Sequence, residues 1–113
     1  METIDVNELH EMMTQGDEFM LINVLDEENF HEHHIPGSRN VPINTPNFAE
    51  RVEQMVGDKD RTIVVYCANT ECTASPTAAK KLEHAGFTNV LDFEGGIEAW
   101  EQAQRPVEKG PRV

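Results

Sequence analysis

The sequence predicts an α/β protein built on a parallel sheet with helices on both faces. Short apolar runs of strand length alternate along the chain with segments of helical periodicity. The apolar runs are nearly continuous, as in strands that are buried on both faces of a parallel sheet. The 113 residues are enough for one hydrophobic core, so we expect a single domain over residues 1–113 with right-handed crossovers.

The first predicted element is an amphipathic helix near the N-terminus. Residues 5–8, Asp-Val-Asn-Glu, have the pattern of a capping box. Val6, Leu9 and Met13 then fall on one helical face, and Gly16 ends the helix.

A buried strand and a second short strand are expected next. Residues 19–25 form a mostly apolar run of strand length. Asp26 can cap a short helical turn through Phe30, and the turn sequence 34–37, His-Ile-Pro-Gly, follows it. Val41 then begins another short strand or extended segment.

The middle of the chain predicts two helices around a strand. Thr45 followed by Pro46 is typical of a helix start, so a helix is expected over residues 46–56, closed by Gly57. Residues 62–67 form an apolar, β-branched strand, and a helix is expected from Ser75 to about Ala85.

The C-terminal part predicts one more strand and one more helix. Residues 90–93 form the last short strand, and Gly95-Gly96 provides a tight turn into a helix that carries Ile97 and Trp100. Prolines mark residues 105–113 as a loose tail.

Composition and charge exclude several function classes. The net charge of −12 argues against nucleic acid or an anionic membrane as a partner, because both attract Lys and Arg. No apolar run approaches the roughly 20 residues of a membrane span. The N-terminus lacks the basic and apolar regions of a signal sequence, so a cytoplasmic location is expected. In that reducing compartment, two cysteines close in sequence are expected to be reactive rather than structural.

Cys67 is the strongest candidate for catalysis. It stands at the carboxyl end of the 62–67 strand, where open α/β sheets place their active sites. The amides of the following loop and the N-terminus of the next helix favour an anion there. A free thiol has a pKa near 8.5, and such surroundings favour the thiolate that acts as the nucleophile.

Several stretches resemble the single-domain rhodanese family, and they occur in the family's order from about residue 3 to residue 107. The matching stretches are Leu21-Ile22-Asn23-Val24, residues 34–42, Tyr66-Cys67, residues 78–82, residues 86–90 and residues 94–100. The resemblance implies a five-stranded parallel sheet and a catalytic cysteine that carries sulfur as a persulfide. Matched by position, that cysteine is Cys67.

The loop after Cys67 departs from the usual family pattern. It is two residues longer, Ala74 stands in the position of the family's arginine, and Cys72 adds a second thiol. The expected substrate-binding residues are those of this loop and the helix start: Ala68, Asn69, Thr70, Glu71, Cys72, Thr73, Ala74 and Ser75.

The loop composition bears on the substrate. Without an arginine, the loop lacks the bidentate cation that phosphoryl or arsenate chemistry requires, which argues against a phosphatase. Glu71 adds negative charge, so a dianion such as thiosulfate is disfavoured relative to a protein persulfide or a polysulfide.

Three interpretations of Cys72 remain open from the sequence. It is a resolving thiol that forms a disulfide with Cys67, a second sulfur acceptor, or a loop residue without chemistry. Five residues of separation permit the Cα distance of a disulfide but do not establish it.

The sequence predicts neither a metal site nor a cofactor. His31 and His33 lack a nearby cysteine or a second histidine pair at metal spacing, and His34 belongs to the family's turn sequence. Gly95-Gly96 lacks the rest of a dinucleotide fingerprint and is interpreted as a turn.

The function favoured by the sequence is a sulfurtransferase with a small sulfur donor, a thiol acceptor and an optional protein partner. The alternative is a non-catalytic module of the same fold. In that case the Cys67/Cys72 pair would serve redox sensing, sulfur sensing or docking.

Overall fold

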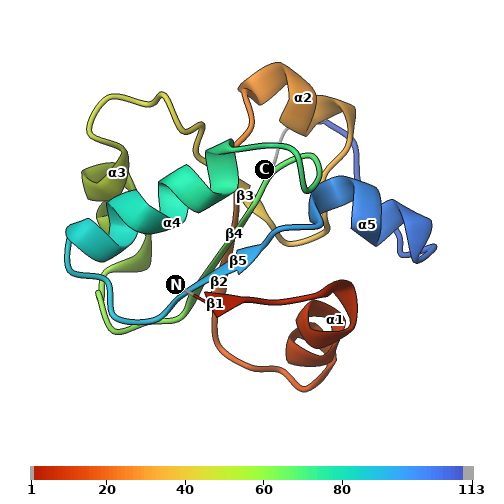
Figure 1. Ribbon diagram of the computed structural model, residues 1–113, viewed down its shortest axis with the longest axis horizontal. Coiled ribbons are helices and arrows are strands. Elements are labelled where there is room, and N and C mark those ends of the chain that lie inside the picture. The colour runs from red at the N-terminus through yellow and green to blue at the C-terminus, as the bar shows by residue number, and fades with distance from the viewer. Residues whose placement is uncertain (1, 111–113) are drawn as a thin grey trace.

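A computed structural model describes residues 2–110 and confirms the five-stranded parallel α/β fold (Figure 1). The strands are β1 (Glu2–Thr3), β2 (Met20–Asn23), β3 (Arg39–Asn40), β4 (Ile63–Tyr66) and β5 (Val90–Phe93). They lie in the order β1-β5-β4-β2-β3, and each neighbouring pair is parallel. The helices are α1 (Val6–Thr14), α2 (Glu27–Glu32), α3 (Phe48–Val56), α4 (Ala74–His84) and α5 (Gly96–Gln102).

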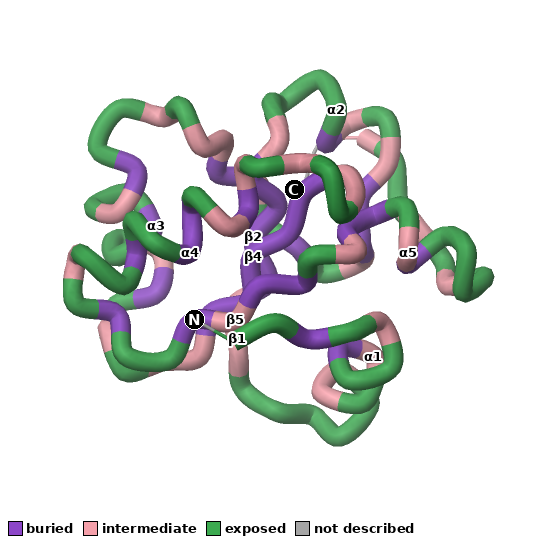
Figure 2. Tube along the Cα trace, in the orientation of Figure 1, coloured by how far each residue is buried: buried purple, intermediate pink, exposed green. Residues whose placement is uncertain are grey.

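The core occupies both faces of the central strands, which Figure 2 shows as the most continuously buried part of the chain. On one face, α3 and α4 pack through side chains such as Val52 and Leu82. On the other face, α1 and α5 pack through Leu9, Ile97 and Trp100. All four residues of β4 are buried, as the continuous apolar run predicts. No helix within residues 2–110 combines the length and apolar character needed to cross a membrane.

Several element boundaries differ from the sequence prediction. α3 begins at Phe48 rather than Pro46, because Asn47 adopts a left-handed conformation with φ of 56° and residues 42–45 form a hydrogen-bonded turn. β3 ends just before Val41, where the sequence placed its start. The edge strand β1 has only two residues, too few for a periodic pattern. The capping box at Asp5 and Glu8 is confirmed.

Tyr66 links the turn at residues 35–38 to the end of β4. Its hydroxyl accepts a hydrogen bond from the Ile35 amide at 3.1 Å and lies 2.8 Å from Ser38 Oγ. Burial raises the pKa of Tyr66, whose hydrogen-bond partners partly offset the effect. Tyr66, the residue before Cys67, is therefore fixed by hydrogen bonds inside the core.

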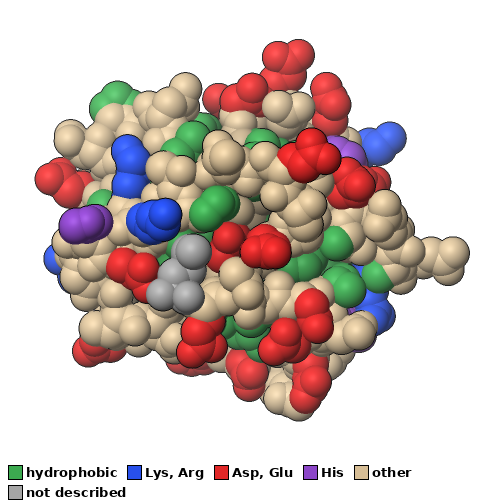
Figure 3. Space-filling view, in the orientation of Figure 1, with side chains coloured by type: hydrophobic (Ala, Val, Ile, Leu, Met, Phe, Trp, Pro, Cys, Tyr) green, Lys and Arg blue, Asp and Glu red, His purple; other side chains and the backbone are tan. Residues whose placement is uncertain are grey.

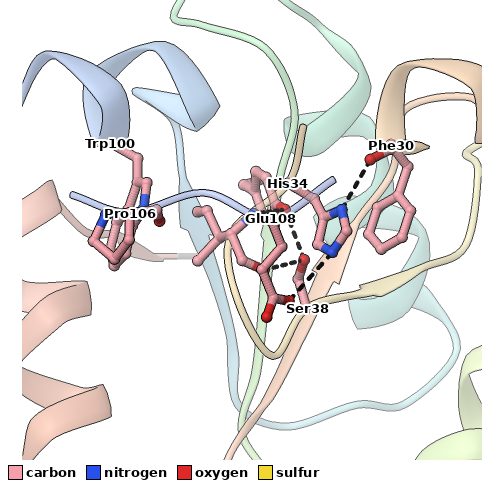
Figure 4. Close-up of polar contacts among 8 residues, drawn as sticks. Phe30, His34, Ser38, Trp100, Pro106 and Glu108 are labelled. Atoms are coloured by element: carbon pink, nitrogen blue, oxygen red, sulfur yellow. Dashed lines mark hydrogen bonds and ion pairs between the residues drawn. The ribbon is translucent and has the colours of Figure 1, made fainter. Parts of the chain in front are cut away.

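The C-terminal segment, which the sequence predicted to be a loose tail, is hydrogen-bonded to the body as far as Gly110. Figure 4 shows Pro106 and Glu108 of this segment beside Trp100 and His34. His34 and Glu108 exchange two backbone hydrogen bonds of 2.9 Å, and the Trp100 indole donates to the Pro106 carbonyl at 2.7 Å. The segment supplies partners for buried polar groups, which a count of prolines does not reveal. Residues 111–113 of the predicted tail lie outside the described residues.

Candidate functional site: the Cys67 loop

The backbone of Cys67 is held by the start of α5. Cys67 directly follows β4 and is buried, and its carbonyl accepts a hydrogen bond of 3.0 Å from the Ile97 amide. The next carbonyl, that of Ala68, accepts one of 2.9 Å from the Glu98 amide. The Gly95-Gly96 turn therefore brings α5 against the beginning of the loop, and this is its structural role.

Asn69 organises the middle of the loop. Its carbonyl accepts the Cys72 amide at 3.1 Å, and its Oδ1 accepts the Glu71 amide at 3.0 Å. Its Nδ2 donates to the Glu98 carboxylate at 3.2 Å, which ties the turn to α5. The amides of Glu71 and Cys72, which the sequence assigned to anion stabilisation with the other loop amides, are bonded to Asn69 in this conformation.

The turn around Asn69 brings the two cysteines together as a disulfide between Cys67 and Cys72, with a Cα–Cα distance of 6.4 Å. This distance lies inside the usual range for disulfides. Cys72 is half-buried and packs against the α3–α4 side of the core. The structure thus contains the site in its oxidised form.

Ser75 brings a hydroxyl group to Cys67 from the first turn of α4. The side chain is buried, and its Oγ lies 3.4 Å from Cys67 Sγ. A disulfide sulfur carries no hydrogen, so the Ser75 hydroxyl is the donor in this contact. Thr73, which precedes the helix, makes no side-chain capping bond.

Asp92 is a buried carboxyl that the sequence analysis missed. It pairs in register with Val65 of β4, two residues before Cys67, so Asp92, Val65 and Cys67 face the same side of the sheet. Burial raises the pKa of Asp92, the Ser75 hydroxyl lowers it, and the Glu94 carboxylate raises it further. The sequence feature that could have identified Asp92 is an acidic residue within an otherwise apolar strand.

The other predicted loop residues lie at the surface of the site. Thr70, Glu71 and Thr73 are exposed, whereas Ala68 and Ala74 are half-buried. Acidic side chains are spread over the face that Figure 3 shows, and Lys and Arg side chains lie over α3 and α4 and also at the opposite edge. A cavity of about 630 Å³ between those helices is lined by residues such as Phe48, Lys80 and His84, and neither cysteine reaches it.

His33 and His34, which were considered as metal ligands, make other contacts. His34 is buried, stacks on Phe30 at 3.9 Å between ring centroids and donates from Nδ1 to the Phe30 carbonyl (Figure 4). Its Nε2 lies 3.5 Å from Glu108, and His33 Nδ1 lies 3.1 Å from Glu101. Among residues 2–110, no group of three potential metal ligands is close enough to hold an ion.

Comparison with known proteins assigns the chain to one domain family. The model of the rhodanese-like domain matches residues 5–103. The chain is 33% identical over 99 residues to the HTH-type transcriptional regulator Rv0324 of Mycobacterium tuberculosis, covering 88% of this chain but only 42% of that protein. It is 33% identical over 100 residues to the thiosulfate sulfurtransferase GlpE of Shewanella oneidensis, covering 88% of this chain and 92% of GlpE. The crystal structure of the BH2092 protein from Bacillus halodurans superposes with a TM-score of 0.86 at 29% identity, covering 96% and 77% of the two chains.

Proposed function

This chain belongs to the rhodanese-like domain family, and we propose that it is a sulfurtransferase that carries sulfur as a persulfide on Cys67. The observation that carries the proposal is the placement of Cys67: at the end of β4, beside the Ser75 hydroxyl and within disulfide reach of Cys72. GlpE, a relative of similar length, is named as a thiosulfate sulfurtransferase, which supports the same class of reaction.

The proposed reaction proceeds in two half-reactions through one covalent intermediate. In the first, the Cys67 thiolate attacks the outer sulfur of a persulfide donor, R–S–SH. The products are the Cys67 persulfide and the donor thiolate, RS⁻. In the second, an acceptor thiolate attacks the outer sulfur and the Cys67 thiolate leaves. No external oxidant or reductant is consumed, because the transferred sulfur keeps its oxidation state throughout.

The protein groups proposed to stabilise the anionic forms are neutral donors. The Ser75 hydroxyl already lies beside the sulfur, and opening of the disulfide frees the loop to reorient its amides. Ala74 offers no cation, and Glu71 adds an exposed negative charge. We therefore propose a protein persulfide or a polysulfide as the donor and a thiol as the acceptor.

The test is sulfur loading of the reduced protein, followed by mass spectrometry of the peptide that contains the loop. With polysulfide as the donor, we expect the wild type and Cys72→Ser to gain a sulfur atom on Cys67 and to pass it to an added thiol. Cys67→Ser should gain none. Reversible formation of the loop disulfide without any loading or transfer would instead support a redox-sensing module.

A further inference from the structure

A fully buried carboxyl group, that of Asp92, lies on the same face of the sheet as Cys67. Asp92 has no exposed surface, and neither of its carboxyl oxygens has a partner within residues 2–110. Burying an ionised carboxylate under such conditions is costly, so this group needs a specific explanation. The Ser75 hydroxyl, which contacts Cys67, lowers the pKa of Asp92. No hydrogen bond of ordinary geometry joins the Ser75 and Asp92 side chains.

The Ser75 hydroxyl contacts the Cys67 sulfur and lowers the pKa of Asp92, and both groups require its single hydrogen. A serine hydroxyl donates one hydrogen bond and accepts up to two. If Asp92 is ionised, its carboxylate competes with the Cys67 sulfur for that hydrogen. If Asp92 is protonated, its own O–H can point to Ser75 Oγ, and the Ser75 hydrogen is then free for the sulfur. The charge on Asp92 therefore decides whether a sulfur anion at Cys67 receives a hydrogen bond.

We propose that Asp92 is a positioning residue that takes the Cys67 proton through Ser75, so that the pair shares one negative charge. In the reduced protein, the thiol hydrogen of Cys67 passes to Ser75 Oγ while the Ser75 hydrogen passes to an Asp92 oxygen. A thiol and a carboxylate become a thiolate and a carboxylic acid, with no change of net charge. The thiolate then receives the Ser75 hydrogen bond, and Asp92 donates to Ser75.

The other charged groups around Asp92 do not provide a competing partner. Along residues 63–67, Cys67 is the only ionisable group on this face, since the phenol of Tyr66 lies on the opposite face of the sheet. α4 turns Ser75 inward, whereas its ionisable side chains are exposed; these are Lys80, Lys81, Glu83 and His84. Beyond β5 stands the exposed Glu94, and the neighbouring β1 carries only the exposed Glu2.

The inference rests on the proposed function only in taking Cys67 as the reacting sulfur. Its test measures ionisation and needs no sulfur transfer, so the two proposals can fail separately. If sulfur loading fails but the charge coupling is observed, the sulfurtransferase proposal is wrong and the role of Asp92 stands. If sulfur loading succeeds but no charge coupling is observed, the sulfurtransferase proposal stands and the role of Asp92 is wrong.

The experiment is the rate of alkylation by iodoacetamide between about pH 3 and pH 10, a range that includes the ordinary pKa values of a carboxyl and a thiol. It uses reduced Cys72→Ser, so that Cys67 is the only thiol. A coupled pair loses its two protons in separate macroscopic steps, so we expect two rises in rate with a plateau between them. Adding Asp92→Asn should remove the lower step and leave a single rise, because the amide keeps a donor towards Ser75 but cannot accept the proton.

Two further variants distinguish proton transfer through Ser75 from a direct electrostatic effect of a nearby carboxylate on Cys67. Ser75→Ala should also lose the lower step, although both ionisable groups remain. Glu94→Gln removes a nearby exposed carboxylate and should keep both steps. A single rise in the Cys72→Ser protein that superimposes on the rise of the Asp92→Asn variant would overturn the proposal.

A second measurement covers the case in which Asp92→Asn does not fold. The carboxyl carbon of Asp92 can be followed by NMR in reduced Cys72→Ser. It should titrate in two steps, the second at the pH where Cys67 completes its ionisation. In the variant with both Cys67→Ala and Cys72→Ser, a single step is expected. Identical titrations in the two proteins would exclude any coupling between Asp92 and the thiol.

Discussion

Gly96 is in direct backbone contact with Cys67. It has φ of 64°, and a Cβ at this position would overlap the carbonyl oxygen of Cys67 and the carbonyl group of Ala68. The same close approach lets the following residue, Ile97, donate its amide to the Cys67 carbonyl. The position of Cys67 therefore depends on the absence of a side chain at Gly96, in another element.

Replacement of Gly96 should lower the free energy of unfolding, and the part due to steric overlap can be measured separately. Gly16 has a similar φ of 72° but nothing within 4 Å of its Cβ direction, so Gly16→Ala should lose only the left-handed backbone preference, about 1–2 kcal/mol. Gly96→Ala should lose about 1–3 kcal/mol more because of the overlap. The free energies of unfolding from urea titration give the comparison. Equal losses would show that α5 can move away from the loop without cost.

The oxidised protein should be unable to accept sulfur. In the disulfide, Cys67 has no thiolate and is buried, so polysulfide has no nucleophile to load. Loading should return after reduction, and Cys72→Ser should load without any reductant pretreatment. Loop mass measured before and after reductant provides the check. Full loading of the oxidised wild type would contradict the prediction that the disulfide blocks sulfur loading of Cys67.

Thiosulfate should be a poor donor, and added salt should raise its rate. Its two negative charges meet a protein of net charge −12 and a loop that has Ala74 and Glu71 but no arginine. Salt screens such repulsion. Ala74→Arg should raise the thiosulfate rate by about tenfold or more, since one well-placed donor can have effects of this order. The matched neutral variant Ala74→Gln should not, and equal gains in both would dismiss the charge argument.

Asp92→Asn should stabilise the fold at neutral pH but not in acid. The pKa of Asp92 is raised in the folded protein above its ordinary value of 3.8, so the folded state binds the proton more tightly than the unfolded chain. This contribution to stability is complete below pH 3.8 and is lost as pH rises through the folded pKa. The stability gain of the variant should therefore grow from acid to neutral pH. Urea titrations at several pH values measure it, with the exposed Asp17→Asn as the control that should show no such trend.

The sequence predicted the sheet and the place of Cys67 because both depend on long apolar runs. β4 is apolar throughout, and the residue after such a strand must lie at the edge of the sheet where loops meet. Asn47 and the two-residue β1 were missed because a single left-handed residue and so short a strand leave no periodic signal. The association of Asp92 with Ser75 joins two elements, and only the packing of α4 on β5 brings them together.

The short spacing of the two cysteines determines what their bond does to the free energy of the whole fold. The disulfide closes a ring with a sequence separation of only 5, so the unfolded chain loses little conformational freedom when it forms, worth about 2 kcal/mol in the chain-entropy account. Residues 67–72 lie outside the strands and helices, so oxidation does not form or break the backbone hydrogen bonds of a strand or helix inside the ring. The bond can therefore open and close as a local event, while the surrounding sheet keeps the hydrophobic packing on which its stability depends.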